Sequence, residues 1–359
     1  MEHLVDVAVI GGGQAGLAAG YFLRRAKADF VILDDREEPG GSWPGYWDSL
    51  RLFSPAAHSM LPGWWMPAEE GQEYPSARHV AWYLTEYERR YALPVRRSVH
   101  VRRVERTGSR LRLVTDGDTW SARYVISATG TWRAPHIPEV PGRDVFEGEQ
   151  LHTVDYRRPE GFAGQRVVVV GGGNSAAQIL AEVSEVAQTT WVTSRPPRFL
   201  PDDVDGRALF ALATGSQKAA ERGEARPEGI AELGDIVVVP SVREARERGD
   251  TKAEPMFDRL TRTGAAWADG TTMDCDVIVW CTGFHPVLNH IDSLELVNEQ
   301  GRIAVEGTRA VAQPRLHLLG YGDWTGPASA TLIGAARTAK TTVAQITRVL
   351  EAEAGAGTG

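Results

Sequence analysis

The 359-residue sequence has few cysteines and no long apolar run, and each shortage excludes a class of protein. Its two cysteines, Cys275 and Cys281, cannot build a disulfide framework or a zinc ligand set within this chain, so we expect no metal site. No run of about 18 apolar residues occurs, and the N-terminus shows no basic and apolar leader. We therefore expect a cytoplasmic protein that does not bind a membrane.

Positively charged residues are fewer than negatively charged ones. The chain has 39 Lys and Arg against 47 Asp and Glu, a formal net charge of -8. Proteins that bind nucleic acids usually present a basic face, so we expect no nucleic-acid partner. The stretch "VREARERGD" (242–250) is interpreted as a solvated helix face. No Ser-His-Asp triad or pair of carboxylates stands out for hydrolytic chemistry.

Glycine is abundant, and the first glycine cluster lies in "VDVAVIGGGQAGLAAGYFL" (5–23). The β-branched run, the glycines and the small residues at helical spacing predict a strand, a tight turn and a helix. Gly11, Gly13 and Gly16 fit G-x-G-x-x-G, in which the glycines allow the turn, the approach of a pyrophosphate and close packing of the helix. A glycine-rich strand end that only closes a tight turn is the alternative.

An acidic strand end follows this first loop. The run "FVIL" ends in Asp34 and Asp35, where a second strand presents a carboxylate to the ribose of an adenosine. The alternative is an acidic strand end that faces water. Together with the glycines, this position predicts a dinucleotide site.

A second glycine cluster lies in "RVVVVGGGNSAAQIL" (166–180), where Gly171 and Gly173 are followed by Ala176 at the third position. The fingerprint allows alanine there. The chain therefore carries two predicted phosphate cradles.

The strand end after the second loop has no acid. Thr193, Ser194 and Arg195 stand in its place, and Arg198 follows. A planar cation without a competing carboxylate suits a 2'-phosphate, which favours NADPH over NADH at this site. An ordinary surface arginine is the alternative.

The repeat extends beyond the glycine loops. Residues 99–135 predict a small antiparallel meander that ends in "ATG", and residues 257–286 repeat this order and end in "CTG". We predict an α/β fold with two Rossmann-like domains, the second inserted in the first. The expected boundaries are 1–155 plus 285–350 for the first domain, 156–284 for the second and 351–359 for a disordered tail; residues 201–235 are expected to form helices and a loop.

The segment 314–340 returns the chain to the first domain. It predicts a strand, then Asp323, then a helix that opens near Thr325 to Ala328. An Asp at this place can hold a ribityl hydroxyl of a flavin, and the helix N-terminus can stabilise negative charge on the reduced ring. The alternative is an ordinary strand-to-helix turn with an Asp cap.

The stretch "FEGEQLHTVDY" makes a family resemblance specific. Phe146, Gly148, His152 and Tyr156 match F-x-G-x-x-x-H-x-x-x-[YF], the motif of the flavin-containing monooxygenases, which the chain resembles over nearly its whole length. The related Baeyer-Villiger monooxygenases carry Trp where this chain has Tyr156. The resemblance implies FAD in the first cradle and NADPH, with NADH as an alternative, in the second.

The stretch "PGGSWPGYWDSLRLFSP" (39–55) resembles the G-G-x-W flavin loop of the same family. The sequence departs from the family next to it, because Phe53 stands where many members carry an Asn near the reacting flavin position. Ser54 and Asn174 are then the polar candidates at the flavin face. Further details resemble the NAD(P)H-dependent flavin monooxygenases encoded with bacterial arsenic-resistance genes.

The resemblance implies a reaction as well. NADPH would reduce the flavin, oxygen would form a C4a-hydroperoxyflavin, and one oxygen atom would pass to a soft nitrogen, sulfur or arsenic nucleophile. The partners implied are a small-molecule substrate and O2, and the sequence is compatible with a homodimer. The alternatives are an NAD(P)H oxidase or quinone reductase of the same fold, a disulfide reductase and a nucleotide-binding sensor.

The expected site residues form four sets. For FAD they are Gly11, Gly13, Gln14, Ala15, Gly16, Asp34, Asp35, Gly41, Ser42, Trp43, Ala128, Thr129, Gly130, Asp323 and Thr325. For NADPH they are Gly171, Gly173, Asn174, Ser175, Ala176, Ser194, Arg195, Thr282 and Gly283. The flavin-face candidates are Asn174, Ser54 and Phe53, and the family motif is Phe146, Gly148, His152 and Tyr156.

Overall fold

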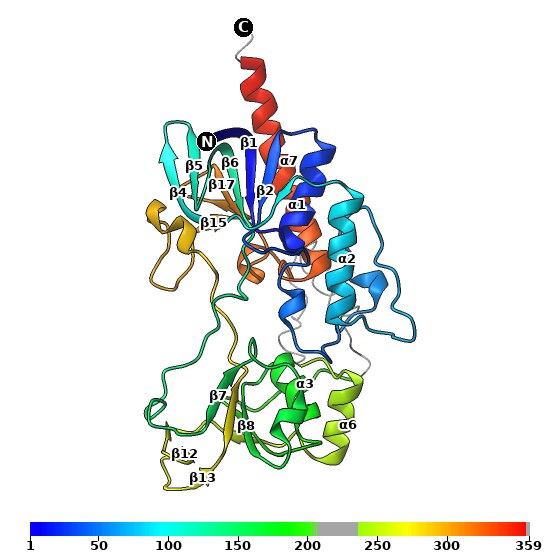
Figure 1. Ribbon diagram of the computed structural model, residues 1–359, viewed down its shortest axis with the longest axis vertical. Helices are drawn as coiled ribbons and strands as arrows, with labels where there is room; N and C mark the ends of the chain where they lie inside the picture. Colours follow the sequence, from blue (N-terminus) through cyan, green and yellow to red (C-terminus); the bar gives the residue numbers. More distant parts are fainter. Residues whose placement is uncertain (203, 205, 207–235, 357–359) are drawn as a thin grey trace, which may run out of the picture. The chain divides into compact units, whose positions relative to one another are not determined.

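The structure, a computed structural model, describes residues 1–202, 204, 206 and 236–356 (Figure 1). Its contacts divide the chain into two units. Unit 1 comprises Met1–Pro44, Pro55–Ala134 and His285–Gly359, and unit 2 comprises Gly45–Ser54 and Pro135–Phe284. Most of the segment 201–235, for which the sequence predicts helices and a loop, lies outside the described residues.

The sheet of unit 1 has nine strands among the described residues. Its parallel part has the order β17 (Leu316–Leu318), β6 (Thr119–Ser127), β1 (Glu2–Ile10), β2 (Phe30–Leu33) and β3 (Val95–Arg96). The antiparallel strands are β4 (Val101–Thr107) and β5 (Arg110–Thr115), joined to β6, and β15 (Val305–Glu306) and β16 (Arg309–Ala310), joined to β17. The second half of β1 is buried throughout, as expected for a central parallel strand covered on both faces.

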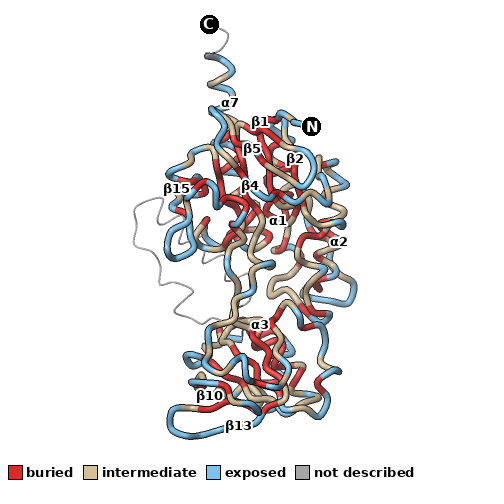
Figure 2. Tube along the Cα trace, turned by 60° about the vertical axis from the view of Figure 1, so that its left-hand side comes forward, coloured by how far each residue is buried: buried red, intermediate tan, exposed pale blue. Residues whose placement is uncertain are grey.

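The helices of unit 1 are α1 (Gln14–Arg25), α2 (Ala77–Arg90) and α7 (Leu332–Ala356), of which α1 and α7 pack together. Short 3-10 turns occupy Trp43–Gly45, Ala56–His58, Asn289–Leu294 and Asp323–Thr325. Helix α2 begins after Ser76, whose hydroxyl accepts a hydrogen bond from the His79 N–H at 3.1 Å. Figure 2 shows that buried residues are concentrated along the central strands and α1 of this unit.

Unit 2 contains a parallel sheet of five described strands. Their order is β10 (Ala253–Pro255), β9 (Gln188–Thr193), β8 (Arg166–Val170), β14 (Val277–Trp280) and β7 (Glu149–His152). A separate antiparallel meander consists of β11 (Arg259–Leu260), β12 (Gly264–Ala266) and β13 (Thr272–Asp274). The helices are α3 (Asn174–Val183) and α6 (Pro240–Arg248), with a 3-10 turn at Pro159–Phe162.

The predicted fold class is confirmed: each unit has a parallel α/β core in which one strand, β1 or β8, leads through glycines into a helix, and each has small antiparallel strands as well. The two units do not follow the expected boundaries. Residues 135–155 group with unit 2 because β7 pairs with β14, with Leu151 opposite Val279. Residues 45–54 join the same unit.

Two expectations about the C-terminal segment are wrong. Helix α7 begins at Leu332 rather than near Thr325, because Gly326 and Ala328 adopt positive φ values of 129° and 55° that a right-handed helix does not allow. Residues 351–356, expected in a disordered tail, form the last turns of α7. Separately, no helix in the described part of the chain is long and apolar enough to cross a membrane.

Candidate cofactor sites

The first glycine loop leaves no room for a side chain at Gly11, Gly12 or Gly16. Gly11 has a φ of 105°, and a Cβ on it would lie 2.5 Å from the Ala128 carbonyl oxygen. A Cβ on Gly16 would overlap the Gly11 carbonyl oxygen, so α1 packs directly on the turn. The loop therefore needs glycine at both positions for the reasons that the sequence pattern suggests.

The N-terminus of α1 is open to an anion. Gly13 precedes the helix, no side chain caps it within the described residues, and its first turn contains no acidic residue. Its free N–H groups and the positive end of the helix dipole therefore fit a pyrophosphate. Gly41 of the predicted flavin loop approaches closely, because a Cβ on it would lie 2.8 Å from Gly13 Cα.

The Gln14 side chain joins two further predicted segments to this helix end. Its Oε1 accepts a hydrogen bond from Trp43 Nε1 at 3.0 Å, and its Nε2 donates to the Ala330 carbonyl at 2.6 Å. In the second segment, Thr325 is buried and bonds the Ser329 hydroxyl at 2.8 Å, whereas Asp323 is exposed. The structure thus gathers three predicted FAD segments at one end of α1.

The two acidic residues after β2 are held by arginines that sequence reasoning missed. Asp34 is 4% exposed and pairs with Arg97, which also pairs with Glu88. Asp35 pairs with Arg133. A Cβ on Gly12 would overlap the Asp34 carboxylate, so Asp34 lies directly beside the glycine loop. The only sequence signal for Arg97 is the arginine-rich stretch that follows β3.

A buried polar network lies behind the predicted "ATG" segment. Thr129 Oγ1 donates to the Val287 carbonyl at 2.7 Å and lies 2.7 Å from the Tyr321 hydroxyl. Tyr321 also contacts Ser127, which lies 3.0 Å from His290 Nε2. Burial lowers the pKa of His290 to about 4, so its ring is neutral at physiological pH. No sequence pattern indicates this network, because its members come from distant segments.

The second glycine loop resembles the first, except that Ala176 replaces the third glycine. Gly171 has a φ of 133°, a Cβ on it would overlap the Cys281 carbonyl oxygen, and its own carbonyl accepts a hydrogen bond from Trp191 Nε1 at 2.7 Å. Gly173 precedes α3 without a side-chain cap in this described region, and a Cβ there would meet nothing within 4 Å. Ala176 is fully buried at the third position. The α3 N-terminus therefore also fits a pyrophosphate.

The other predicted NADPH residues surround this loop. Thr193, at the end of β9, is buried beside Gly172, whereas Ser194 and Arg195 are exposed. Thr282 donates through its hydroxyl to the His136 carbonyl. Gly283 follows with a φ of 85°, and Ser175 is half-buried in the first turn of α3. Arg195 is thus exposed two residues after Thr193, which contacts the loop at Gly172.

The residues of the family motif make structural contacts within unit 2. His152 ends β7, and its Nε2 lies 3.0 Å from the Gly283 carbonyl while its Nδ1 accepts from the Val154 N–H at 3.3 Å. These partners assign the neutral ring with the proton on Nε2, and burial lowers the pKa of His152 in agreement. A Cβ on Gly148 would overlap the Phe146 ring. His152 therefore holds the Thr-Gly turn that follows β14.

Tyr156, the last motif residue, belongs to a network that the sequence does not reveal. Its ring is buried between Phe162 and Trp47, and its hydroxyl donates to Glu182 Oε1 at 2.5 Å. Ser49 donates to the second oxygen of Glu182, also at 2.5 Å. Burial is the main cause that raises the pKa of the Glu182 carboxyl. This network fastens residues 45–54 to α3.

The three flavin-face candidates all belong to unit 2. The Phe53 carbonyl accepts a hydrogen bond from the Gly206 N–H at 2.7 Å, and a Cβ on Gly206 would overlap the Ser54 hydroxyl. Asn174 Oδ1 accepts from the Val237 N–H at 2.8 Å. Phe53 and Asn174 thus form hydrogen bonds to main-chain N–H groups. Their part in the reaction stays a prediction.

The two cysteines do not form a redox-active pair. Both are free thiols, and burial raises the pKa of Cys275 to about 11 and that of Cys281 to about 12. Disulfide exchange requires a thiolate, which these thiols do not supply near neutral pH. The geometry therefore supports chemistry that two nucleotide cofactors carry out without a protein dithiol.

Comparison with known proteins identifies the family. The family model described as pyridine nucleotide-disulphide oxidoreductase matches residues 8–205, more than half of the chain. A flavin-containing monooxygenase from Stenotrophomonas maltophilia is 52% identical, with 97% of this chain and 99% of that chain covered and a TM-score of 0.88. The chain belongs to this oxidoreductase family and to the flavin-containing monooxygenases.

Curated relatives of this flavin-containing monooxygenase are more distant. An "Uncharacterized oxidoreductase CzcO-like" from Geobacillus kaustophilus is 28% identical over 93% of this chain and 95% of its own length. A rice protein described as indole-3-pyruvate monooxygenase YUCCA8 is 27% identical over 84% of this chain and 81% of its own. The family uses a flavin and a nicotinamide cofactor, in agreement with the two glycine loops.

Replacement of Gly11 by alanine tests the first loop. The new Cβ would meet the Ala128 carbonyl at 2.5 Å in a backbone conformation that disfavours L side chains, so we expect Gly11→Ala to lose most of its bound flavin. The measurement is the flavin-to-protein absorbance ratio after purification. Gly117→Ala, in a turn where a Cβ would meet nothing within 4 Å, should keep the wild-type ratio. An unchanged ratio in Gly11→Ala would contradict the assignment of the loop.

The Glu182 network predicts a pH dependence of stability. Because the folded-state pKa of Glu182 is raised, its stabilising effect is present below the ordinary value of 4.5 and is lost as the pH rises through the folded-state pKa. We expect the denaturation midpoint of the wild type to decrease as the pH is raised above 4.5, and to decrease less in Glu182→Gln. Glu254→Gln, at an exposed side chain of β10, is the control. Equal pH slopes in Glu182→Gln and wild type would show that the carboxyl does not titrate in this range.

Proposed function

We propose that this protein is an FAD-dependent, NADPH-consuming monooxygenase that adds one oxygen atom to a nucleophilic nitrogen, sulfur or arsenic of a small molecule. One observation carries the proposal. Two helix N-termini without a side-chain cap follow glycine turns whose first glycine, Gly11 or Gly171, has no room for a Cβ, and the strand end beside each turn carries a different charge.

The first cradle suits the adenosine half of FAD. Asp34 follows β2 directly and touches the glycine loop, which is where a carboxylate reaches a ribose hydroxyl. Its pairing with Arg97 fixes the position of the carboxylate. Gln14 holds Trp43 of the flavin loop beside the same helix end, so this chain positions a loop with a large aromatic side chain next to the phosphates. FMN, which lacks the adenosine half, would leave Asp34 without a ligand.

The second cradle suits NADPH. The strand end carries Ser194 and Arg195, both exposed, and the buried residue before them, Thr193, is neutral. An arginine fork bonds a phosphate in two places, whereas a carboxylate at this position would repel the 2'-phosphate. NADH remains a usable substitute, because the pyrophosphate site at α3 is the same for both nucleotides.

When bound, the two cofactors supply hydride transfer and oxygen activation. The chain itself binds the two pyrophosphates at the N-termini of α1 and α3 and orients Trp43 through Gln14. It also fixes the Thr-Gly turn after β14 through the neutral His152 ring. None of these groups needs to accept a proton during turnover, which fits chemistry centred on the cofactors.

An NAD(P)H oxidase or quinone reductase is the second candidate function. Phe53 favours it, because it stands where many flavin-containing monooxygenases carry an Asn, and its carbonyl is bound to Gly206. This chain lacks the side-chain amide of that Asn. Exclusion of water from the flavin face then determines whether an oxygen atom is transferred to a substrate or is released as peroxide.

Arg195→Ala tests the choice of nucleotide. A charge-assisted hydrogen bond contributes about 1.5 to 3 kcal/mol, so the variant should lose roughly ten- to hundredfold in kcat/KM for NADPH. Its kcat/KM for NADH should stay nearly unchanged, which provides an internal control. Arg259→Ala removes an exposed arginine of unit 2 that makes no ion pair with any described residue, and it should alter neither value. Equal losses with both nucleotides in Arg195→Ala would make the arginine structural.

Isotope transfer tests the proposed function directly. Under 18O2, with NADPH and in turn an amine, a sulfide and a trivalent arsenical, we expect one labelled oxygen atom per product molecule from at least one class. Product formed should account for most of the NADPH consumed. The flavin-deficient Gly11→Ala variant should form no labelled product. NADPH oxidation that yields only peroxide with every class would assign the protein to the oxidase function instead.

A further inference from the structure

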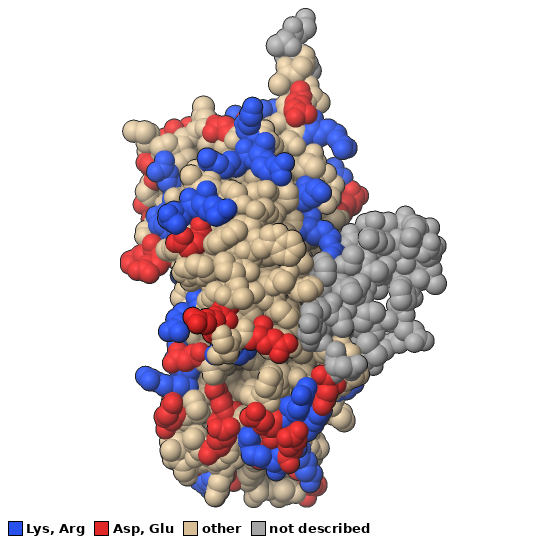
Figure 3. Space-filling view, turned by 90° about the vertical axis from the view of Figure 1, so that its right-hand side faces the viewer, with Lys and Arg blue, Asp and Glu red and all other residues tan. Residues whose placement is uncertain are grey.

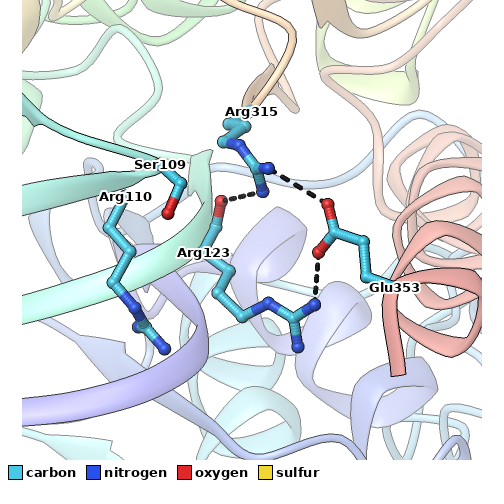
Figure 4. A pocket seen from close by; sticks show the side chains of 5 residues that line it. All are labelled: Ser109, Arg110, Arg123, Arg315 and Glu353. Atoms are coloured by element: carbon cyan, nitrogen blue, oxygen red, sulfur yellow. Dashed lines mark hydrogen bonds and ion pairs between the residues drawn. The ribbon is translucent and has the colours of Figure 1, made fainter. Parts of the chain in front are cut away.

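Unit 1 contains a pocket of about 360 Å³ that the cofactor sites do not use (Figure 4). It is lined by Ser109 in the β4–β5 turn, Arg110 of β5, Arg123 of β6, Arg315 just before β17 and Glu353 of α7. Three of its five lining residues are arginines. That composition suits an anion.

The pocket lies away from the glycine loop. The loop contacts the chain just after Ser127, the last residue of β6, whereas Arg123 lies four residues earlier on that strand. At about 3.3 Å per residue, this separation is roughly 13 Å along the strand. Arg110 reaches the Val5 carbonyl in the first half of β1. The arginines therefore do not belong to the cradle at the end of β1.

Main-chain and aromatic contacts orient two of the arginines. Arg110 donates through one terminal nitrogen to the Val5 carbonyl at 3.0 Å and to the Ser121 carbonyl at 2.9 Å. The Arg315 guanidinium lies over the Tyr124 ring, 5.2 Å from its centroid. Side chains fixed in this way lose little freedom when they bind a ligand.

The pocket has more positive than negative charge. Arg123 pairs with Asp6 at 3.1 Å and with Glu353, and Arg315 pairs with Glu353 at 3.0 Å. Arg110 makes no ion pair with any described residue. Three guanidinium groups thus face two carboxylates, and the single carboxylate of Glu353 bridges two of them (Figure 4).

The Glu353 contact can be exchanged. Ile346 is the last fully buried residue of α7 in the described chain, and residues 347–355 are half-buried or exposed. The final turns of α7 extend past the strands of unit 1 (Figure 1), and Lys and Arg side chains gather at the same end of that unit (Figure 3). Since no side chain described after Ile346 is buried, the ion pairs of Glu353 contribute to holding these turns, and helix ends with little buried surface open readily.

We propose that this pocket binds a phosphate dianion, free or as the phosphomonoester of a small molecule, which takes the place of the Glu353 carboxylate between Arg123 and Arg315. A dianion compensates the excess charge that one carboxylate leaves, and Arg110 supplies a third guanidinium. Binding releases Glu353 and loosens the last turns of α7. The glutamate thus acts as a built-in competitor for the ligand.

Calorimetric titration of the flavin-loaded protein tests this proposal, with inorganic phosphate in one series and glycerol 3-phosphate in another. Wild type should bind at least one of them saturably, and the tighter of the two identifies the source of the phosphate. Glu353→Gln removes the competing charge and should tighten binding about fivefold. Glu351→Gln, an exposed glutamate on the same helix without an ion pair in the described structure, should bind like wild type.

Two further measurements separate the pocket from other phosphate sites. Arg110→Gln leaves the Glu353 ion pairs intact and should weaken binding about tenfold or more. Hydrogen exchange of residues 347–355 should accelerate on addition of phosphate in wild type and be fast without it in Glu353→Gln. Absence of saturable binding to both wild type and Glu353→Gln, or equal affinities in Glu353→Gln, Glu351→Gln and Arg110→Gln, would overturn the proposal.

Discussion

The close approach of main chain to main chain at the first glycine turn is the constraint on which unit 1 depends. The turn after β1 presses Gly11 against the Ala128 carbonyl, and α1 presses Gly16 against the carbonyl of Gly11. Because no side chain intervenes, the helix N-terminus lies at the end of the central strand with its N–H groups exposed. In unit 2, Gly171 makes the equivalent close contact with the Cys281 carbonyl. The positions of both predicted nucleotides follow from these contacts.

The sequence predicted the local units of this fold well. A β-branched strand, a glycine turn and a helix of small residues are specified by adjacent residues, and both such units formed where expected. The boundaries between the units were harder to predict, since they depend on pairing between distant strands such as β7 with β14. The tail was misread for a similar reason, because an ion pair between Glu353 and Arg123 holds its helical turns.

In the candidate sites, too, features set by neighbouring residues were predictable and features set by distant residues were not. The positions of the cradle glycines were predicted from their spacing, because a phosphate cradle has a fixed local geometry, and the tight contacts of Gly11, Gly16 and Gly171 agree with that geometry. Arg97 and Glu182 were missed because the chain folds them toward partners far away in sequence, and no residue pattern records such a meeting. The motif residue Tyr156 was identified, yet its contact with Glu182 became evident only in the folded chain.

The two thiols also bear on chemical durability. A flavoprotein that reduces oxygen generates peroxide close to its own side chains whenever a turnover fails. Oxidation of cysteine begins with the thiolate, and at neutral pH a thiol with a pKa of about 11 or 12 has roughly one molecule in ten thousand or fewer in that form. Desolvation at Cys275 and Cys281 thus slows the oxidative ageing of this enzyme at its most oxidisable residue type.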